Sequence, residues 1–252
     1  YYNGYYSDRE GNQKAANHVV MLRNTSKGHS LYTTFQLQKN FVDGILKGLY
    51  LNGSYSFGQS RGVTDGTSSV ATSAWKYRAA LDGNAEEVGY TAGSFDGRLL
   101  LSASYTANWS KYAATSFGLI YQRYRPFRYS YCYNGDANGD SQFSNDLMYI
   151  PANFDEVKDH LLPGDFDSQE DAWKAMNAFI EQDPYLSKHR GEYAERNGAV
   201  APFANQLDLS VSHDIKIYQK NGRSHTLRFS FNIANFLNLL NRNWGVVQTT
   251  VL

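Results

Sequence analysis

The feature that most constrains this chain is a strict alternation of apolar and polar residues along several long segments. In residues 206–218 the odd positions carry Leu, Val or Ile except at His213, and the even positions are mostly Gln, Asp, Ser and Lys. The same alternation recurs in residues 49–58, 98–109 and 226–234. Since successive side chains of a β-strand point to opposite faces, each segment predicts a strand with one apolar and one polar face.

Further segments raise the number of predicted strands to about seven. Weaker alternation covers residues 18–24, 30–41 and 113–133. The Asn-Gly pair at 221–222 lies between two alternating segments, which predicts an antiparallel hairpin because a tight turn needs residues that tolerate positive φ. The chain is therefore expected to be all-β and antiparallel.

Two connections are much longer than ordinary hairpin loops, at about 59–97 and 134–202. Each contains a stretch with helical spacing of its apolar residues. The first covers residues 68–81 and the second 167–182, where Asp167 or Ser168 is the expected N-cap. We expect both helices to pack on their own loops and not to hold a cofactor.

Composition excludes several classes of function. Lys+Arg and Asp+Glu both total 24, so no basic surface for nucleic acid is indicated. A single cysteine, Cys132, rules out an internal disulfide framework and a cysteine-based zinc site. No nucleophile elbow, zinc-protease motif or phosphate loop is present, and the six histidines show no ligand-like pairing. We therefore expect no catalytic residues and no enzyme.

Alternating strands fit either a soluble sandwich or a membrane barrel. Three features favour the barrel. The predicted strands run about 9 to 12 residues, as tilted membrane-spanning strands do. Aromatic residues make up 15% of the chain, and Trp109, Tyr121 and Tyr124 fall near strand ends, as in interfacial girdles. Short and very long links alternate, as periplasmic turns and extracellular loops do.

Three segments also carry motifs. They are "YSYCYNGDANGDSQFSNDLMYIP" at 129–151, "NQLDLSVSHDI" at 205–215 and "FSFNIANFLNLLNRNWG" at 229–245. These segments resemble the C-terminal part of TonB-dependent outer-membrane receptors of Bacteroidetes, in particular the Oar-like type. "NFLNLLNRNWG" is similar to that family's strand end, and "GDANGDSQFSNDLMYIP" is similar to one of its loops.

The resemblance implies a barrel of about 22 strands closed around an N-terminal plug. Residues 1–252 would then be a fragment of one outer-membrane barrel domain, with loops 59–97 and 134–202 outside the cell. The family imports nutrients with energy from TonB, so the implied partners are outer-membrane lipid, the TonB complex through an N-terminal region not present here, and a nutrient ligand with or without a surface lipoprotein. No cofactor is implied.

The loop at 134–146 allows two interpretations. Asp136, Asn138 and Asp140 have the spacing of a calcium loop, and Asn145 and Asp146 add oxygen ligands at its end. The sixth position, however, is Ser141 where such loops have Gly, and Asp146 falls one position before the usual closing acid. The other interpretation is a structural turn, since Asn and Asp bond their own backbone. Both Ca²⁺ binding and a purely structural turn are retained as hypotheses.

Tyrosines beside this loop are candidate ligand contacts. Tyr129, Tyr131 and Tyr133 alternate before it and could stack a sugar or peptide. The alternative is that these rings pack within the loop itself. A second function is therefore considered, a surface all-β carbohydrate-binding module with calcium at 136–146.

Overall fold

The computed structural model describes residues 2–7, 13–19, 22–66, 68–218 and 224–249. The chain forms two compact units. We call the first the loop unit (Tyr1–Ser30, Ser60–Ser94 and Arg128–Val200) and the second the sheet unit (Leu31–Gln59, Phe95–Phe127 and Ala201–Leu252). Each is described by itself below.

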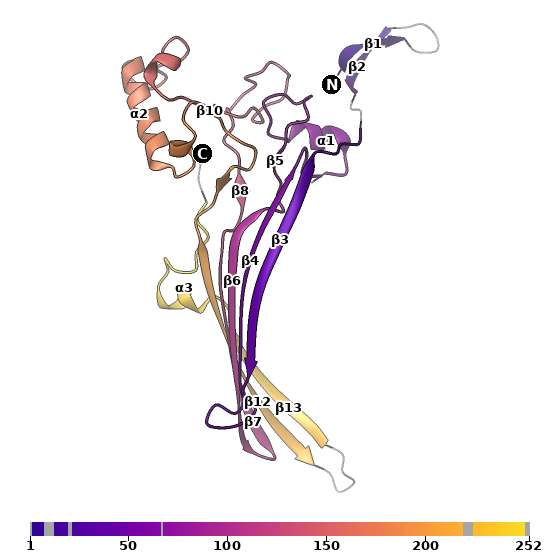
Figure 1. The fold of residues 1–252 in the computed structure, drawn as a ribbon, viewed down its shortest axis with the longest axis vertical. Helices are drawn as coiled ribbons and strands as arrows, with labels where there is room; N and C mark the ends of the chain where they lie inside the picture. The colour runs from indigo at the N-terminus through magenta and orange to yellow at the C-terminus, as the bar shows by residue number, and fades with distance from the viewer. Residues whose placement is uncertain (1, 8–12, 20–21, 67, 219–223, 250–252) are drawn as a thin grey trace. The chain divides into compact units, whose positions relative to one another are not determined.

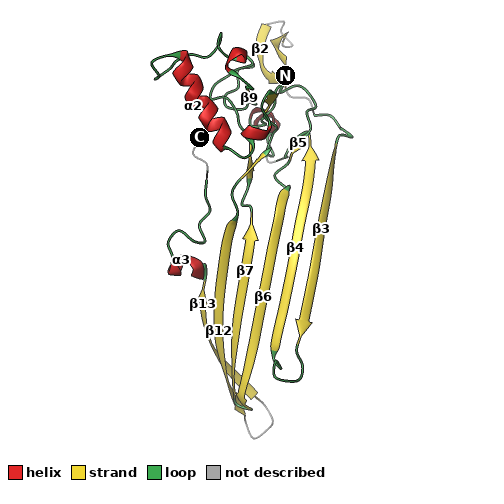
Figure 2. Ribbon diagram, turned by 60° about the vertical axis from the view of Figure 1, so that its left-hand side comes forward, coloured by secondary structure: helices red, strands yellow, loops and turns green. Residues whose placement is uncertain are grey.

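Six long strands form one sheet in the order β13-β12-β7-β6-β4-β3, and short β5 pairs with β4 (Figures 1 and 2). Their bounds are β3 Gly28–Asn40, β4 Leu49–Gly62, β5 Gly89–Tyr90, β6 Phe95–Ser110, β7 Ala113–Tyr124, β12 Ala204–Tyr218 and β13 Ser224–Ile233. The pairings of β4 with β5 and β6, of β6 with β7, and of β12 with β7 and β13 are antiparallel. The predicted antiparallel all-β fold is confirmed, in a sheet of seven strands.

The register places odd-numbered residues on one face of this sheet. One row across β4, β6, β7, β12 and β13 runs Leu51, Ala103, Leu119, Leu209 and Ile233. We call this the odd face, and the opposite one the even face. The predicted alternation is therefore in phase across β4, β6, β7, β12 and β13, because outside the bulges the partners in these ladders have equal parity.

Two predicted strands have different bounds in the structure. Residues 22–24 lie outside any strand, β2 ends at Val19, and residues 20–21 are outside the described part of the chain. The predicted strand 113–133 ends as β7 at Tyr124, and a separate short strand, β8, follows at Arg128–Tyr129. Pro126 lies between them and cannot donate to a ladder, which is consistent with the break. The turn predicted at 221–222 is also outside the described residues.

Both predicted helices are present, one of them shortened. α1 covers only Ala71–Lys76, and no side-chain cap supports its start. α2 covers Gln169–Gln182, and Ser168 Oγ accepts a hydrogen bond from Asp171 N at 3.1 Å, as the capping pattern predicts. No helix in the described ranges has the length and apolarity needed to cross a lipid bilayer.

The remaining elements are short. They are β1 Tyr2–Ser7, β2 Gln13–Val19, β9 Tyr149–Ile150, β10 Glu192–Tyr193, β11 Ala199–Val200, the 3₁₀ turns Phe154–Glu156 and Leu186–Lys188, and α3 Phe236–Leu240. β1 pairs with β2, β9 with β10, and β8 with β11. α3 follows β13 and is tied to β12, because the backbone N–H of Asn235 donates to Asp208 Oδ1 at 2.7 Å.

Candidate functional site

A small apolar core lies in the part of the loop unit formed by residues 128–200. Its buried members are Tyr131, Ile150, Ile180, Leu186, Ala194 and Ala199, and four partly buried side chains pack against them, Tyr129, Met148, Met176 and Tyr185. α2 contributes Ile180 and Met176, two of its apolar residues at helical spacing. The second long connection is therefore ordered by apolar packing of its own.

The three candidate tyrosines have different surroundings. Tyr131 is only 3% exposed, and its ring stacks on Tyr185 with centroids 6.2 Å apart. Its hydroxyl donates to Asp183 Oδ2 at 2.6 Å, and burial raises the pKa of this phenol well above its ordinary value. Tyr129 meets Tyr131 edge-on, whereas the Tyr133 ring is 39% exposed. Ligand contact stays a prediction, and Tyr133 is the member whose ring is accessible for it.

Arg196 holds the two long connections together, and Arg78 braces the first of them. Arg196 is 4% exposed and donates to the main-chain carbonyls of Gly62 and of Val63. Arg78 donates to the carbonyls of Val63 at 3.0 Å and Gly83 at 2.7 Å. Burial lowers the pKa of both guanidinium groups, since it disfavours the charged form. Neither residue was a predicted site residue.

Tyr90 and two further arginines, Arg61 and Arg128, form a stacked group next to Arg196. Two guanidinium groups contact the ring of Tyr90, with Arg61 Cζ 4.4 Å and Arg128 Cζ 4.0 Å from the ring centroid. Arg61 also forms an ion pair with Glu195. Such cation–π contacts favour Arg because its flat group stacks on an aromatic face.

A cavity of about 320 Å³ opens beside this network. Its lining includes Leu81, Glu87, Leu147, Tyr193, Glu195 and Arg196, so both long connections contribute to it. The carboxylate of Glu87 accepts the backbone N–H groups of Leu81 and Asp82 at 2.9 and 2.8 Å, which fixes one wall. Apolar walls with a few oriented polar groups are typical of small-ligand pockets.

The 134–146 loop is folded by its own acidic side chains. Asp136 Oδ1 accepts from Gly139 N at 2.8 Å and Asp140 N at 3.0 Å, and its Oδ2 accepts from Ser141 N at 2.8 Å. Asn138 Oδ1 accepts from Asp140 N at 2.9 Å. These are the bonds of the structural-turn hypothesis. Ser141, at the position where calcium loops have Gly, adopts φ +66°.

The loop closes through Asp146. Its Oδ2 accepts from Ala137 N at 2.6 Å, and its main-chain carbonyl accepts from Tyr133 N at 2.9 Å. Asn145 and Asp146 are buried, whereas Asn138 is exposed and Asp136 and Asp140 are half-buried. The structure therefore gathers all five predicted metal ligands into one loop but gives Asp136 and Asn138 turn-forming roles. Within the described residues no group of three His, Cys, Asp or Glu side chains is arranged to hold a metal ion.

The lone cysteine adjoins this loop. Cys132 is partly buried, and burial followed by the nearby Asp146 charge raises the pKa of its thiol to about 11. A thiol with such a pKa is a poor nucleophile at neutral pH.

The sheet unit carries a second set of ordered polar groups, on the even face. Gln36 donates to Asn52 at 2.7 Å, Gln122 donates to Gln206 at 2.9 Å, and Arg98 donates to Gln122 at 2.9 Å. These bonds join side chains from neighbouring strands into polar rows. Near the other end of the sheet Arg228 and Asp214 form a bidentate ion pair. Arg228 Nε donates to Asp214 Oδ1 at 2.6 Å, and Arg228 Nη2 donates to Asp214 Oδ2 at 2.7 Å.

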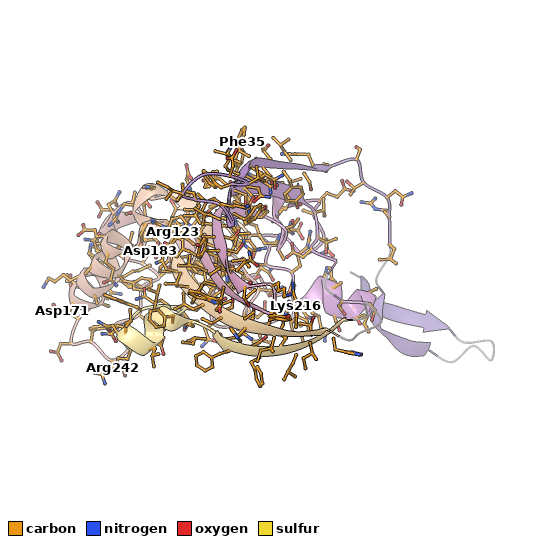
Figure 3. All side chains as sticks on the ribbon, turned by 90° about the horizontal axis from the view of Figure 1, so that it is seen from below. Phe35, Arg123, Asp171, Asp183, Lys216 and Arg242 are labelled. Carbon is orange, nitrogen blue, oxygen red and sulfur yellow. The ribbon has the colours of Figure 1, made fainter. Side chains whose placement is uncertain are left out.

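The odd face has the opposite character. Its large apolar side chains are exposed on every long strand, among them Leu31, Phe35, Leu37, Leu51, Leu101, Tyr105, Phe117, Leu119, Ile215, Ile217, Leu227, Phe229 and Phe231. Phe35, labelled in Figure 3, projects from β3 and is 65% exposed. Exposed apolar surfaces of this kind are typical of proteins that associate with lipid or with another apolar surface.

Comparison with protein-family models, with curated proteins and with solved structures finds no match to this chain.

Proposed function

We propose that the chain is part of an outer-membrane TonB-dependent receptor that takes up a nutrient ligand through a plugged β-barrel. The observation that carries the proposal is the division of the sheet into an exposed apolar odd face and a hydrogen-bonded polar even face. A barrel wall needs this arrangement, since one face meets acyl chains and the other a polar interior.

Strand length and the edge strands support the same proposal. The six long strands have 10 to 16 residues, enough to cross a bilayer at the usual tilt. Within the described sheet, β3 and β13 stand at the two ends of the strand order. An open edge in a membrane leaves backbone groups unpaired, so further strands of the same barrel are expected to cover both.

Trp109 lies where an interfacial anchor is expected. It sits at a bulge near the end of β6, is 67% exposed, and donates from Nε1 to Thr115 Oγ1 at 2.7 Å. Thr115 in turn shares a hydrogen bond of 2.9 Å with His213 Nδ1. An aromatic ring with one polar handle is typical of the membrane–water interface.

In this proposal the loop unit is the ligand-recognising part. The cavity beside Arg196 and the exposed ring of Tyr133 are its candidate contacts, and both belong to the long connections that receptors place outside the cell. TonB and a surface lipoprotein would be partners of the complete receptor. The nutrient itself is left unassigned.

Spin labelling along β7 tests the proposal. Single nitroxides are placed at residues 114–122 in a Cys132→Ala background, and the protein is reconstituted into liposomes. We expect accessibility to oxygen to peak at odd positions such as Phe117 and Leu119, and accessibility to a water-soluble nickel chelate to peak at even positions such as Ser116 and Gly118. The two profiles would alternate with a period of two, out of phase.

The competing function is a surface carbohydrate-binding module. It predicts a protein that stays folded and monomeric in buffer without detergent, with both collision reagents reaching the same exposed positions. Either result would remove the barrel from consideration, whatever the loop unit binds.

A further inference from the structure

Three side-chain oxygens in the 134–146 loop are buried and have no hydrogen-bond donor. They are Asp140 Oδ2, Asn145 Oδ1 and Asp146 Oδ1. Asn145 and Asp146 are each only 4% exposed. A buried oxygen without a donor is costly and rare in native proteins, and a bound ion or water is its usual explanation. Because the three oxygens lie between residues 140 and 146, one bound ion beside the loop is the simplest partner for all of them.

That partner is not a cationic side chain of the described chain. The ion pairs of the loop unit use other carboxylates, those of Glu86, Asp155, Asp171, Glu181 and Glu195. The second oxygen of Asp146 accepts from Ala137 N, so this carboxylate is directed into the turn that begins at Asp136. Its other oxygen, Oδ1, is buried and has no donor.

The loop separates its acidic side chains into two groups. All side-chain oxygens of Asp136 and Asn138 accept backbone N–H groups and shape the turn. Asp140 and Asp146 each use one oxygen for the backbone and keep the other without a donor. Asn145 contributes the third such oxygen.

We propose that Asp140, Asn145 and Asp146 bind a calcium ion. Two carboxylates and an amide are hard oxygen donors, and Ca²⁺ accepts such mixed sets with main-chain carbonyls and water completing the shell. Imidazole and thiolate ligands, which zinc prefers, are not among the three. With only two charged ligands, the site should bind in the range of extracellular calcium modules, with a Kd of roughly 0.1 to 1 mM.

The ion would fasten two distant segments of the loop unit to each other. Ala80, in the first long connection, donates to the carbonyl of Asn145 at 3.0 Å and accepts from Leu147 N at 3.3 Å. Asn145 and Asp146 therefore lie at the point where the two connections pair. Calcium is expected to stabilise this pairing, because an ion that binds only the folded loop shifts the equilibrium toward it. The site is independent of the proposed transport function.

Calorimetry on the whole chain tests the proposal. The protein is stripped with a chelator, kept in whatever buffer or detergent holds it monomeric, and titrated with calcium chloride alone. We expect one Ca²⁺ per chain and a rise in the melting temperature of the loop unit. Asp140→Asn should weaken binding at least about tenfold, because it removes one of two charged ligands. Asp165→Asn, an exposed acid of the same long connection, is the matched control and should leave binding unchanged.

Asn145→Asp supplies a test that does not require loss of binding. The added carboxylate should tighten calcium binding, by about tenfold, since affinity follows the number of charged ligands. Absence of heat and of a melting shift in the wild-type protein up to roughly 10 mM, well above the expected range, would overturn the proposal. So would equal affinities for wild type, Asp140→Asn and Asn145→Asp.

Discussion

The hydroxyl of Tyr131 donates a hydrogen bond to Asp183 Oδ2 over 2.6 Å and so joins the segment after β8 to the C-cap of α2. The other oxygen of Asp183 accepts from Tyr185 N and Leu186 N at 2.8 Å each. One carboxylate thus fixes the end of α2, the turn that follows it and the central ring of the core. The core of the loop unit depends on this pair.

Replacing Tyr131 by Phe tests the importance of the pair. The variant keeps the ring stacking but leaves Asp183 Oδ2 without its donor, and a lost bond to a charged group costs about 1.5 to 3 kcal/mol. Guanidinium unfolding followed by fluorescence of Trp75 and Trp173, both in the loop unit, should report this decrease. Tyr77→Phe is the control and should change stability by less, because Tyr77 also lies in the loop unit but is 83% exposed. Equal stability of Tyr131→Phe and wild type would contradict the assignment.

Arg196 is expected to be the most sensitive side chain of the cavity wall. Arg196→Met fills a similar space but removes the side-chain donor to the Gly62 carbonyl, whereas the Val63 carbonyl keeps its hydrogen bond from Arg78. A buried carbonyl that loses its donor costs about 1 to 3 kcal/mol, so the loss should be at least about 1 kcal/mol. Arg23→Met removes only an exposed pair with Glu86 and should change stability by about 0.5 kcal/mol or less. Similar effects of the two variants would refute the structural role of Arg196.

The thiol of Cys132 makes a pH-dependent prediction. Its pKa is raised from 9.0 to about 11, so the folded protein holds the thiol proton more tightly than the unfolded chain does. The resulting stabilisation is complete below pH 9 and is lost as the pH rises through about 11. A disulfide reagent at pH 9 should react with folded protein about fifty times more slowly than with protein in urea, from the thiolate fractions alone. Equal rates would show that the thiol is not shielded.

The folding free energy of a variant with a charge on the odd face tests the membrane proposal. Phe117→Arg places a guanidinium on the apolar face and should cost about 2 to 4 kcal/mol of folding free energy in liposomes. Ser116→Arg, one residue earlier on the even face, should cost much less. Urea-dependent folding into liposomes measures both. If Phe117→Arg were as stable as Ser116→Arg, the odd face would not meet lipid.

The strands and the capped helix could be predicted because their signals are local. Alternation at 206–218 specifies both a strand and the face of each residue, and Ser168 with its acidic first turn specifies where α2 begins. The strand predicted at 18–24 was wrong at residues 22–24, where the alternation is weak and the backbone forms no strand. The end of β7 at Tyr124 was also missed, although Pro126 was a visible signal.

The network around Arg196 could not be predicted, because its partners are carbonyls more than a hundred residues away. Main-chain carbonyls have no sequence signature, so nothing marks an arginine that will bond to them. Tyr131 and Tyr133 look alike in sequence, and only the packing of α2 distinguishes the core ring from the exposed one. The metal hypothesis named five residues of one loop, and the hydrogen bonds were needed to separate Asp136 and Asn138, which shape the turn, from Asp140, Asn145 and Asp146.

In the ladders of β7, partner residues are both odd-numbered or both even-numbered, and this limits insertions and deletions in the sheet. Adding or deleting a single residue inside β7 would turn every side chain beyond it to the wrong face on two neighbouring ladders at once. Length variation of one residue is tolerable only where a bulge absorbs it, as at Trp109, or within the connections. Homologues of this chain should therefore keep the lengths of their strands and differ in the lengths of their loops.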